Sequence, residues 1–189
     1  MRNKKVLLIT ETAITIALCV VLNFIAIRLP FSTAGGSISL TMLPIAILAL
    51  RRGPVWGCLA GLLFGLIDFM IDPYIVHWVQ VILDYPAPYA LFGLFCGFFR
   101  KPFLAGVEQN KAKAAAIAVV GVVVGCIARF ISHCASGAIF FAEYTPEGQS
   151  VLAYNLAYNI SYLGPSLIAV AILATIIAIP LCKALPVEG

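Results

Sequence analysis

Long apolar runs separated by short polar stretches form the dominant pattern of this sequence. Six of the runs are long enough, or nearly so, to cross a bilayer core, which needs about 20 helical residues. They are residues 6–27, 38–50, 55–71, 79–99, 114–141 and 152–181. The second run is short, so we expect it to tilt less, to begin inside the preceding loop, or to extend past Leu50 with Arg51 at the membrane surface. The pattern predicts an all-α membrane protein, a single domain over residues 1–189 built as a bundle of six transmembrane helices.

The composition agrees with a chain whose main solvent is lipid. Hydrophobic residues make up 62% of the 189 residues and charged residues only 11%, against about 45–50% and about 25% in soluble domains. A globular core of this length cannot hide so much apolar surface, so a bilayer must cover the excess. The net charge of +4 is small and scattered, which argues against a nucleic-acid partner. The six cysteines form no Cys-x-x-Cys pair, and we interpret them as small buried residues.

Basic residues indicate how the bundle is oriented. Most of the twelve Lys and Arg residues fall on one side of the predicted bundle: Arg2, Lys4, Lys5, Arg51, Arg52, Arg100, Lys101, Lys111, Lys113 and Lys183. By the positive-inside rule this side is cytoplasmic, and both termini lie there. The basic N-terminus followed by an apolar run resembles a signal sequence. That run is long and no small-x-small cleavage site follows, so we expect it to remain as the first helix.

Few ionisable residues fall inside the apolar runs. Each one needs a reason, because an ionisable group at the bilayer centre costs at least about 2.5 kcal/mol. The candidates are Glu11, Asp68, Asp84, Arg129 and His133. We expect Glu11 to be solvated near the cytoplasmic surface, and the sequence assigns no role to Asp68. Arg129 is a candidate ion-pair partner for Asp84.

Asp84 has the most informative surroundings. Gln80 lies four residues before it and therefore shares its helix face. Pro86 and Pro88 lack backbone donors and should bend the helix just after Asp84. A carboxylate beside aromatic rings at a helix bend suits a bound organic cation. The alternative is an ion pair between Asp84 and Arg129.

The fifth run carries Arg129, His133, Gly137 and Phe141 at steps of four, which places them along one slowly drifting helix face. His133 can donate and accept hydrogen bonds, Gly137 lets a ligand or a helix approach closely, and Phe141 offers a stacking surface. The alternative for His133 is a hydrogen-bonded packing residue.

A polar stripe follows one face of the sixth run, at steps of four, three and four: Asn155, Asn159, Tyr162 and Ser166. Its alternative role is to hold neighbouring helices together. With Asp84 and His133, the stripe predicts one outward-facing pocket. Aromatic residues join this pocket: Tyr74, Tyr85, Phe141 and Tyr154. Such groups suit a flat, positively charged heteroaromatic ligand, because the rings would stack on it, the amides would orient it and the carboxylate would offset its charge.

Four stretches form a specific combination that spans nearly the whole chain. The first runs from Gly35-Gly36-Ser-Ile-Ser-Leu-Thr-Met-Leu-Pro44 to Arg51-Arg52-Gly53, and the second is Leu83-Asp84-Tyr85-Pro86. The third is His133-x-x-Ser136-Gly137-x-Ile139-Phe140-Phe141-x-x-Tyr144, and the fourth is Tyr154-Asn-Leu-Ala-Tyr-Asn159. Together they resemble the motifs of one transporter family, the thiamin-specific substrate-binding subunits (S-components) of energy-coupling factor (ECF) transporters.

The resemblance implies the S-component fold, a bundle of six helices that binds thiamin near the extracellular side under the loop between the first two helices. In that family an acidic residue at the position of Asp84 faces the ligand, and Tyr85 matches an aromatic packing position. Residues matching three more positions also face the ligand: His133, Tyr154 and Asn159. We add to the candidate binding site the residues that pocket chemistry suggests: Gly137, Phe141 and Tyr74. No catalytic residue, cofactor or metal site is predicted.

Two positions depart from the family pattern. Members carry tryptophan in the first loop and at the position of Phe141, whereas this first loop contains Phe31 and no tryptophan. We therefore expect ring stacking on the ligand to be weaker or differently shared.

The chain lacks the Gly-x-x-x-x-Gly-Lys-Ser/Thr loop that binds nucleotide phosphates, so energy for transport must come from partners. The resemblance implies docking onto a transmembrane coupling subunit that carries two ATP-binding subunits, through small residues on the first helix. Ala13 and Ala17 fit, since two alanines four apart let another helix approach closely. The alternative is packing within this chain. The resemblance thus implies a non-enzymatic thiamin importer subunit in the plasma membrane of a prokaryote.

Two other protein classes compete with this interpretation. An intramembrane protease could pair Ser132 or Ser136 with His133, but neighbouring residues such as Ser132 and His133 do not face each other on a helix, and no Gly-x-Ser-x-Gly elbow is present. A proton-coupled small-molecule carrier could use Asp68, Asp84 and His133 as a relay. However, 189 residues lack the repeated halves common in such carriers, so this carrier stays as the alternative.

Overall fold

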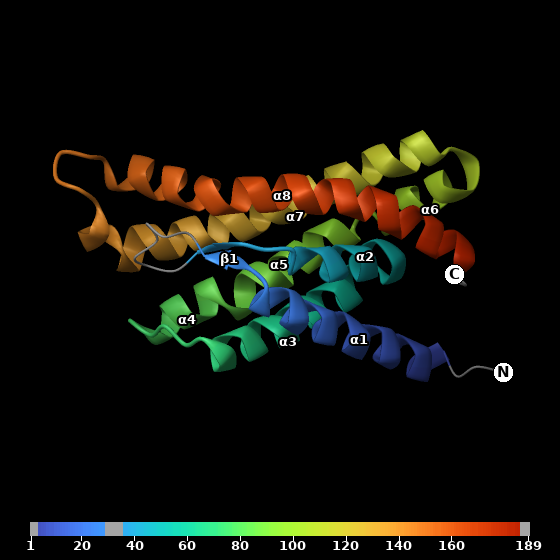
Figure 1. Ribbon diagram of the computed structural model, residues 1–189, viewed down its shortest axis with the longest axis horizontal. Helices are drawn as coiled ribbons and strands as arrows, with labels where there is room; N and C mark the ends of the chain where they lie inside the picture. The colour runs from blue at the N-terminus through green and yellow to red at the C-terminus, as the bar shows by residue number, and fades with distance from the viewer. Residues whose placement is uncertain (1–3, 29–35, 186–189) are drawn as a thin grey trace.

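The computed structural model describes residues 4–28 and 36–185, so Arg2 and Phe31 lie outside the described residues. The chain forms an elongated bundle of helices (Figure 1). In chain order its elements are α1 Lys4–Phe24, β1 Ile27–Arg28, β2 Ser37–Ile38, α2 Met42–Arg52, α3 Pro54–Ile71, α4 Trp78–Asp84, α5 Pro86–Gly97, α6 Arg100–Gln109, α7 Lys111–Phe140, η1 Ala142–Tyr144 and α8 Val151–Ala184. The two short strands pair antiparallel, with Ile27 opposite Ile38. The predicted all-α membrane fold is confirmed.

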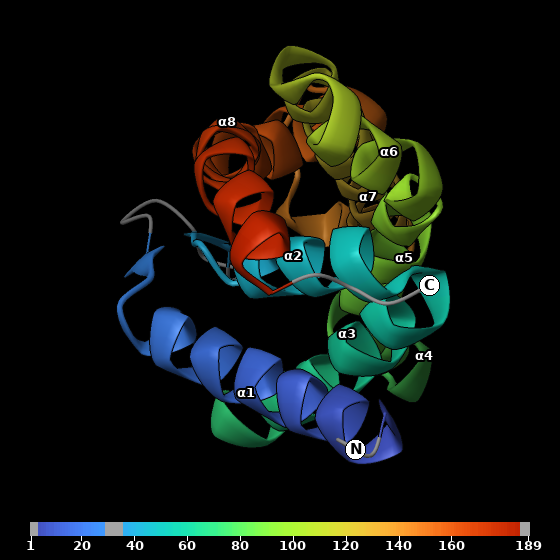
Figure 2. The same cartoon turned by 90° about the vertical axis from the view of Figure 1, so that its right-hand side faces the viewer.

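Five of the six predicted runs form helices long and apolar enough to cross a membrane: α1, α3, α4 together with α5, α7 and α8. The second run forms α2, whose 11 residues reach only about 16 Å. Nine of them are buried, and α2 lies in the middle of the bundle between α1 and α8 (Figure 2). The short run is therefore an internal helix that the other helices surround.

The stretch before α2 is not helical, although the predicted second run already begins at residue 38. Non-helical backbone is tolerated at membrane depth only where it is buried in protein and its polar groups have partners. The Ser39 backbone N–H donates to Ser166 Oγ and the Thr41 N–H donates to Ser39 Oγ, both at 3.0 Å. Cys19 Sγ of α1 donates to the Thr41 carbonyl at 3.3 Å. These contacts let the helix begin at Met42 and tie its start to α1 and α8.

The fourth run bends where its prolines predict a bend. α4 ends at Asp84, and α5 begins at Pro86 after Tyr85 takes φ −114° and ψ −79°. Pro86 has no N–H and cannot continue the hydrogen bonds of α4. Ser132 Oγ of α7 donates to the Leu83 carbonyl at 2.7 Å, which ties the bend to α7. As a result, Asp84 lies at the C-terminal end of α4.

Close packing of α3 on α5 holds the bend in place. Gly57, Gly61 and Gly65 occur at steps of four on α3 and meet the backbone of residues 85–93. A Cβ added at Gly65 would lie 2.6 Å from the Cα of Pro86, closer than side chains can come. Small residues of this kind let membrane helices touch backbone to backbone.

The polar stretch between the fourth and fifth runs is not an irregular connection, because it contains the additional helix α6. Its buried residues, Phe103, Gly106 and Val107, share one face, while Lys101 is exposed. The five residues 103–107 form one short apolar run without helical periodicity, which explains why the sequence does not predict α6. Asn110 then caps α7, accepting hydrogen bonds from the Ala112 and Lys113 backbone N–H groups.

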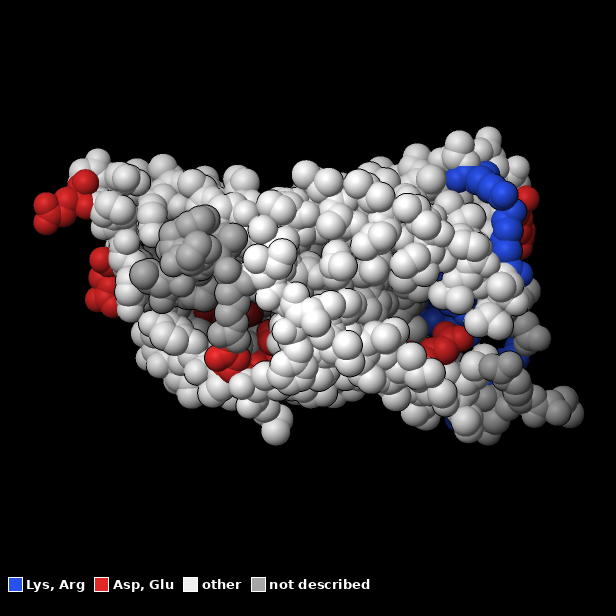
Figure 3. All heavy atoms as spheres, in the orientation of Figure 1, with Lys and Arg blue, Asp and Glu red and all other residues white. Residues whose placement is uncertain are grey.

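Charge is divided between the two ends of the bundle. Figure 3 shows basic side chains at the end where α1 begins and α8 ends, and acidic side chains at the opposite end. By the positive-inside rule the basic end is cytoplasmic, in agreement with the predicted topology. Glu11 is not merely solvated there, which corrects the prediction: it accepts two 2.6 Å hydrogen bonds from Arg52 and one of 3.3 Å from Arg51. The six cysteines are free thiols.

Candidate functional site

A cavity of about 410 Å³ lies at the acidic end of the bundle, lined by residues of α1, α3, α4, α5, α7 and α8 and of the connections between them. All eight residues of the predicted ligand site line it: Tyr74, Asp84, Tyr85, His133, Gly137, Phe141, Tyr154 and Asn159. The fold therefore brings together residues that are up to 85 positions apart in the sequence. Their direct contact with a ligand stays a prediction.

Asp84 is held by two side chains. Gln80 Nε2 donates to Asp84 Oδ2 at 2.8 Å, and His133 Nδ1 lies 3.4 Å from Asp84 Oδ1. The C-terminal end of a helix carries a partial negative charge, so a carboxylate there is unfavourable unless other groups offset it. The Gln80 amide supplies a dipole and no net charge. This arrangement favours a cation in the cavity.

His133 separates Arg129 from Asp84, so the predicted alternative, a direct ion pair of these two residues, is wrong for the part of the chain that the structure describes. Arg129 Nε donates to His133 Nε2 at 3.3 Å. Because Nε2 accepts, Nδ1 carries the proton that faces Asp84. The guanidinium also lies 4.1 Å from the ring centroid of Tyr89. Arg129 thus orients His133, and Ser132 bonds to a backbone carbonyl and not to the histidine.

Tyr85 and Gln80 hold the connection between α3 and α4 over the cavity. The Tyr85 hydroxyl accepts from the Tyr74 backbone N–H and donates to the Asp72 carbonyl, both at 2.9 Å. Gln80 Nε2 donates to the Tyr74 carbonyl at 3.2 Å, and Gln80 Oε1 accepts from the Val76 N–H at 3.1 Å. The Tyr85 hydroxyl therefore shapes the site, in addition to its ring.

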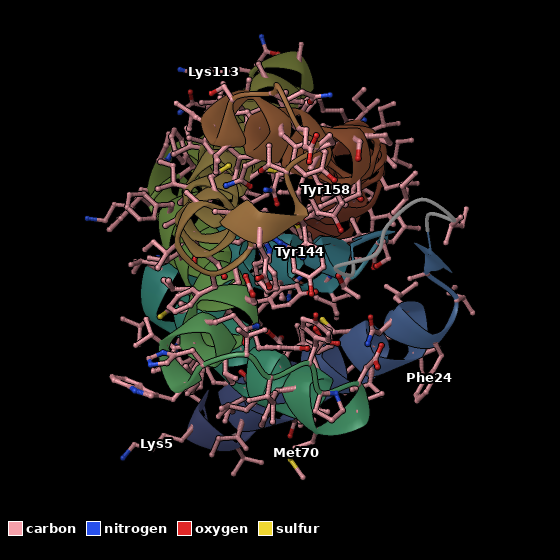
Figure 4. The ribbon with its side chains drawn as sticks, turned by 90° about the vertical axis from the view of Figure 1, so that its left-hand side faces the viewer. Lys5, Phe24, Met70, Lys113, Tyr144 and Tyr158 are labelled. Atoms are coloured by element: carbon pink, nitrogen blue, oxygen red, sulfur yellow. The ribbon has the colours of Figure 1, made fainter. Side chains whose placement is uncertain are left out.

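Three aromatic rings lie at the outer mouth. Tyr74 stacks on Phe141 with centroids 6.0 Å apart and planes 26° apart, and Phe141 is 6.0 Å from Tyr144. The Tyr74 and Tyr144 hydroxyls are 3.2 Å apart, and this hydrogen bond raises the pKa of Tyr74 above its ordinary value. Figure 4 looks onto this end, where Tyr144 and Tyr158 lie over the centre while Met70 points outward. The mouth is thus lined by neutral rings.

The polar stripe of α8 has a divided role. Asn155 Nδ2 donates to the Cys134 carbonyl of α7 at 2.7 Å, which is the helix-binding role given as the alternative. Asn159 Nδ2 donates to Asn155 Oδ1 at 2.6 Å, and the Tyr162 hydroxyl donates to Asn159 Oδ1 at 2.5 Å. Asn159 and Tyr162 also line the cavity. The stripe therefore fixes α8 on α7 and orients the Asn159 amide.

Gly137 makes room for a neighbouring helix. A Cβ at this position would lie 2.6 Å from Asn155 Nδ2. Of the two predicted partners, ligand or helix, a helix side chain is the one in close approach. Nearby, Tyr154 stacks on Tyr158 with centroids 6.3 Å apart, and both rings line the cavity.

Sequence reasoning does not place several of the lining residues in the site, among them Asn23, Asp72, Tyr89 and Tyr144. It also gives Asp68 no role, whereas the structure has Asn23 Nδ2 donating to Asp68 Oδ1 at 2.7 Å. The available signal is that Asn23 and Asp68 are polar residues within apolar runs. They lie on different helices, and periodicity does not tell which helix faces meet.

Comparison with known proteins gives one consistent family. The family model described as thiamine transporter protein (Thia_YuaJ) matches residues 9–185. The thiamine transporter ThiT of Bacillus subtilis (strain 168) is 34% identical over 172 residues, 90% of each chain. ThiT of Lacticaseibacillus paracasei (strain ATCC 334) is 32% identical over 164 residues, 84% of this chain and 80% of that one.

Solved structures agree. ThiT from Listeria monocytogenes superposes with a TM-score of 0.79 at 31% identity, over 97% of each chain. The S-component for biotin from an ECF-type ABC transporter superposes with a TM-score of 0.66 at 21% identity, over 100% of this chain and 95% of that one, which shows a shared fold. These findings favour the substrate-binding subunit over the proton-coupled carrier. The match of the family model to residues 9–185, with relatives above 30% identity over most of the chain, shows that this chain belongs to the thiamine transporter protein family.

Proposed function

We propose that this multi-pass membrane protein is the S-component of an ECF-type importer and captures thiamin from outside the cell in the cavity at its acidic end. Besides family membership, one structural observation is the main support for this proposal. Asp84 is the last residue of α4 and lies in a cavity lined by aromatic rings. Thiamin fits that chemistry, because it joins a flat aminopyrimidine to a cationic thiazolium ring.

The site residues divide the work of recognition in this proposal. Asp84 offsets the thiazolium charge, and His133, oriented by Arg129, supplies a fixed hydrogen-bonding edge. Asn159 and Tyr154 contact the aminopyrimidine from α8, while Phe141 offers its ring face. The binding step needs no catalytic residue, cofactor or metal ion.

Energy for release comes from other chains in this proposal, since the sequence has no phosphate-binding loop. The partners are a transmembrane coupling subunit and two ATP-binding subunits in the plasma membrane of a prokaryote. Ala13 and Ala17 are both exposed on α1, which supports a docking face and does not fit packing within this chain. Two exposed alanines one turn apart let a partner helix approach closely.

Calorimetric titration of the purified protein in nanodiscs tests the ligand assignment. We expect saturable binding of one thiamin per chain without ATP. The uncharged aminopyrimidine fragment of thiamin is the matched probe, and it should bind at least about tenfold more weakly because it offers no charge to Asp84. No detectable binding of thiamin would overturn the proposal, and equal affinity for the fragment would remove Asp84 from its assigned role.

A further inference from the structure

α1 lies at the edge of the bundle, and polar contacts contribute much of its attachment. It packs against α2 and α3, and Figure 2 shows it apart from α7 and α8. Its buried residues are Thr12, Thr15 and Cys19, which bury little apolar surface. Both threonine hydroxyls donate to carbonyls of α1 itself. The position of α1 therefore depends strongly on the contacts near its two ends.

The contacts at these two ends differ in one respect. Near the cytoplasmic end, Glu11 pairs with Arg51 and Arg52 of α2, and none of these three residues lines the cavity. At the outer end, Asn23 Nδ2 donates to Asp68 Oδ1 of α3 at 2.7 Å, and both residues line the cavity. The outer contact is thus placed where it can respond to a ligand.

The charge of the cavity gives a reason for such a response. Asp68 shares the lining with Asp84, and Arg129 is the basic residue among the lining residues described. The Arg129 guanidinium bonds to His133 and lies over the Tyr89 ring, and no ion pair joins it to Asp68 among the residues that the structure describes. Excess negative charge in a partly enclosed site is unfavourable until a cation enters. A cation in the cavity therefore attracts the Asp68 carboxylate as well as that of Asp84.

We infer that Asn23 and Asp68 are positioning residues that link occupation of the cavity to the position of α1. A bound cation holds the Asp68 carboxylate, Asp68 holds the Asn23 amide, and the outer end of α1 is thereby fixed on α3. In the empty cavity, repulsion among the carboxylates weakens this arrangement and the end of α1 opens more often. The inference rests on the proposed function, and it adds that ligand capture orders the helix that carries Ala13 and Ala17.

Hydrogen–deuterium exchange of the purified full-length protein, with and without thiamin, tests the inference. In the unchanged protein thiamin should slow exchange in residues 78–84 and 133–141. It should also slow exchange by about fivefold, the equivalent of one hydrogen bond, in residues 20–26 at the outer end of α1. In Asp68→Ala and in Asn23→Ala the slowing at 20–26 should disappear, while the cavity segments still respond. If the contact were merely structural, each substitution would raise exchange at 20–26 by the same factor with and without thiamin, and the slowing by thiamin would persist.

An exchange of the two side chains provides the sharpest control. Asn23→Asp places two carboxylates face to face and should remove the slowing at 20–26. Combining it with Asp68→Asn restores an amide–carboxylate hydrogen bond and should restore the slowing. Thr10→Val, at an exposed position of the same helix, should keep the response of the unchanged protein.

Each remaining outcome has a distinct meaning. Slowing at 20–26 that survives in Asp68→Ala overturns the inference, and so does its absence in the unchanged protein when the cavity segments respond. Both results leave the proposed function standing. If thiamin changes exchange in no segment of the unchanged protein, the proposed function fails and the inference fails with it.

Discussion

The inner half of the bundle, at the basic cytoplasmic end, and the outer half, which contains the cavity, differ in how their charged side chains are paired. In the inner half, the Glu11 carboxylate meets Arg52 at 2.6 Å and Arg51 at 3.3 Å. Arg51 Nη1 also donates to the Leu181 carbonyl at 3.1 Å, and Arg100 Nε donates to the Arg51 carbonyl at 2.9 Å. Charge-assisted bonds of this kind join α1, α2, α6 and α8. The inner half therefore pairs its buried and partly buried charges of Glu11, Arg51 and Arg52 within the protein.

The outer half places more acidic than basic groups around its cavity. The described lining includes the carboxylates of Asp68 and Asp84 and the guanidinium of Arg129, which bonds to His133 and not to Asp84. Unbalanced charge in a site partly shielded from water lowers stability, and such departures from good packing are expected at functional sites. The difference indicates that charge pairs in the inner half stabilise the fold, and, on the proposed function, that the acidic groups of the outer half are arranged to receive a cation. Substitutions in the outer half should therefore change ligand affinity, and those in the inner half should change stability.

The largest effect is expected for Asp84→Asn, which removes a charge from the outer half and keeps the side-chain shape. Thiamin affinity should fall about 100-fold, or about 2.7 kcal/mol, because a charge-assisted contact is lost. Calorimetric titration measures the change. Glu147→Gln removes an acidic charge at the same end outside the cavity lining, and it should leave affinity within about twofold. An equal loss in both variants would show that a long-range field, and not the cavity, attracts the ligand.

Arg52→Gln tests the inner half. Glu11 then loses its two shortest hydrogen bonds, and the free energy of unfolding should fall by about 2 kcal/mol, less than for a fully buried pair because both side chains are partly exposed. Thiamin affinity should stay unchanged. Denaturant unfolding in detergent and titration of the same sample measure the two quantities, with the exposed Lys101→Gln as control. A loss of affinity without loss of stability would contradict the division into halves.

Sequence reasoning reaches the cavity through single conspicuous residues. Asp84 and His133 are conspicuous because ionisable groups in apolar runs are costly. Pro86 predicts the bend that places Asp84 at the end of its helix. The partners of such residues are not predictable in the same way. Asn23 and Asp68 are 45 residues apart, and the helix periodicity that places each on a face says nothing about which face lies opposite.

The same limit applies to the fold. The apolar run from residue 38 predicts a helix start that is too early, because the tertiary hydrogen bond from the Ser39 N–H to Ser166, 127 residues away, keeps the backbone extended. Glu11 looks solvated until α2 brings Arg51 and Arg52 to it from 40 residues away. Local patterns predict the helices well, whereas contacts between distant segments decide where helices start and which charges are paired.

A smaller effect is expected for Tyr85→Phe, which separates the ring from the hydroxyl. The variant keeps the edge contact with Phe69, at 5.2 Å between centroids, but loses the hydrogen bonds to the backbone of Asp72 and Tyr74. Thiamin affinity should fall about fivefold, or about 1 kcal/mol, because the connection over the cavity is held less firmly. Titration of the purified variant measures this. Unchanged affinity would mean that the connection between α3 and α4 does not shape the bound site.

The smallest effect on the purified protein is expected for the double variant Ala13→Leu and Ala17→Leu, although it should abolish transport. Both alanines are exposed on α1, so the free energy of unfolding should change by no more than about 0.5 kcal/mol and thiamin affinity should not change. In cells that also make the partner subunits, thiamin uptake should be lost, because leucine side chains keep a partner helix at a distance. Ile14→Leu, a swap of similar volume at an exposed neighbouring position, should keep uptake.

Survival of uptake in the double variant would place the docking face elsewhere. A loss of affinity would instead show that the middle of α1 acts on the cavity directly, and the two halves would then be less independent than their charges indicate. Loss of uptake with intact binding is the result that separates them: a cation-dependent outer half that selects the ligand, on a packed inner half that presents α1 to its partner.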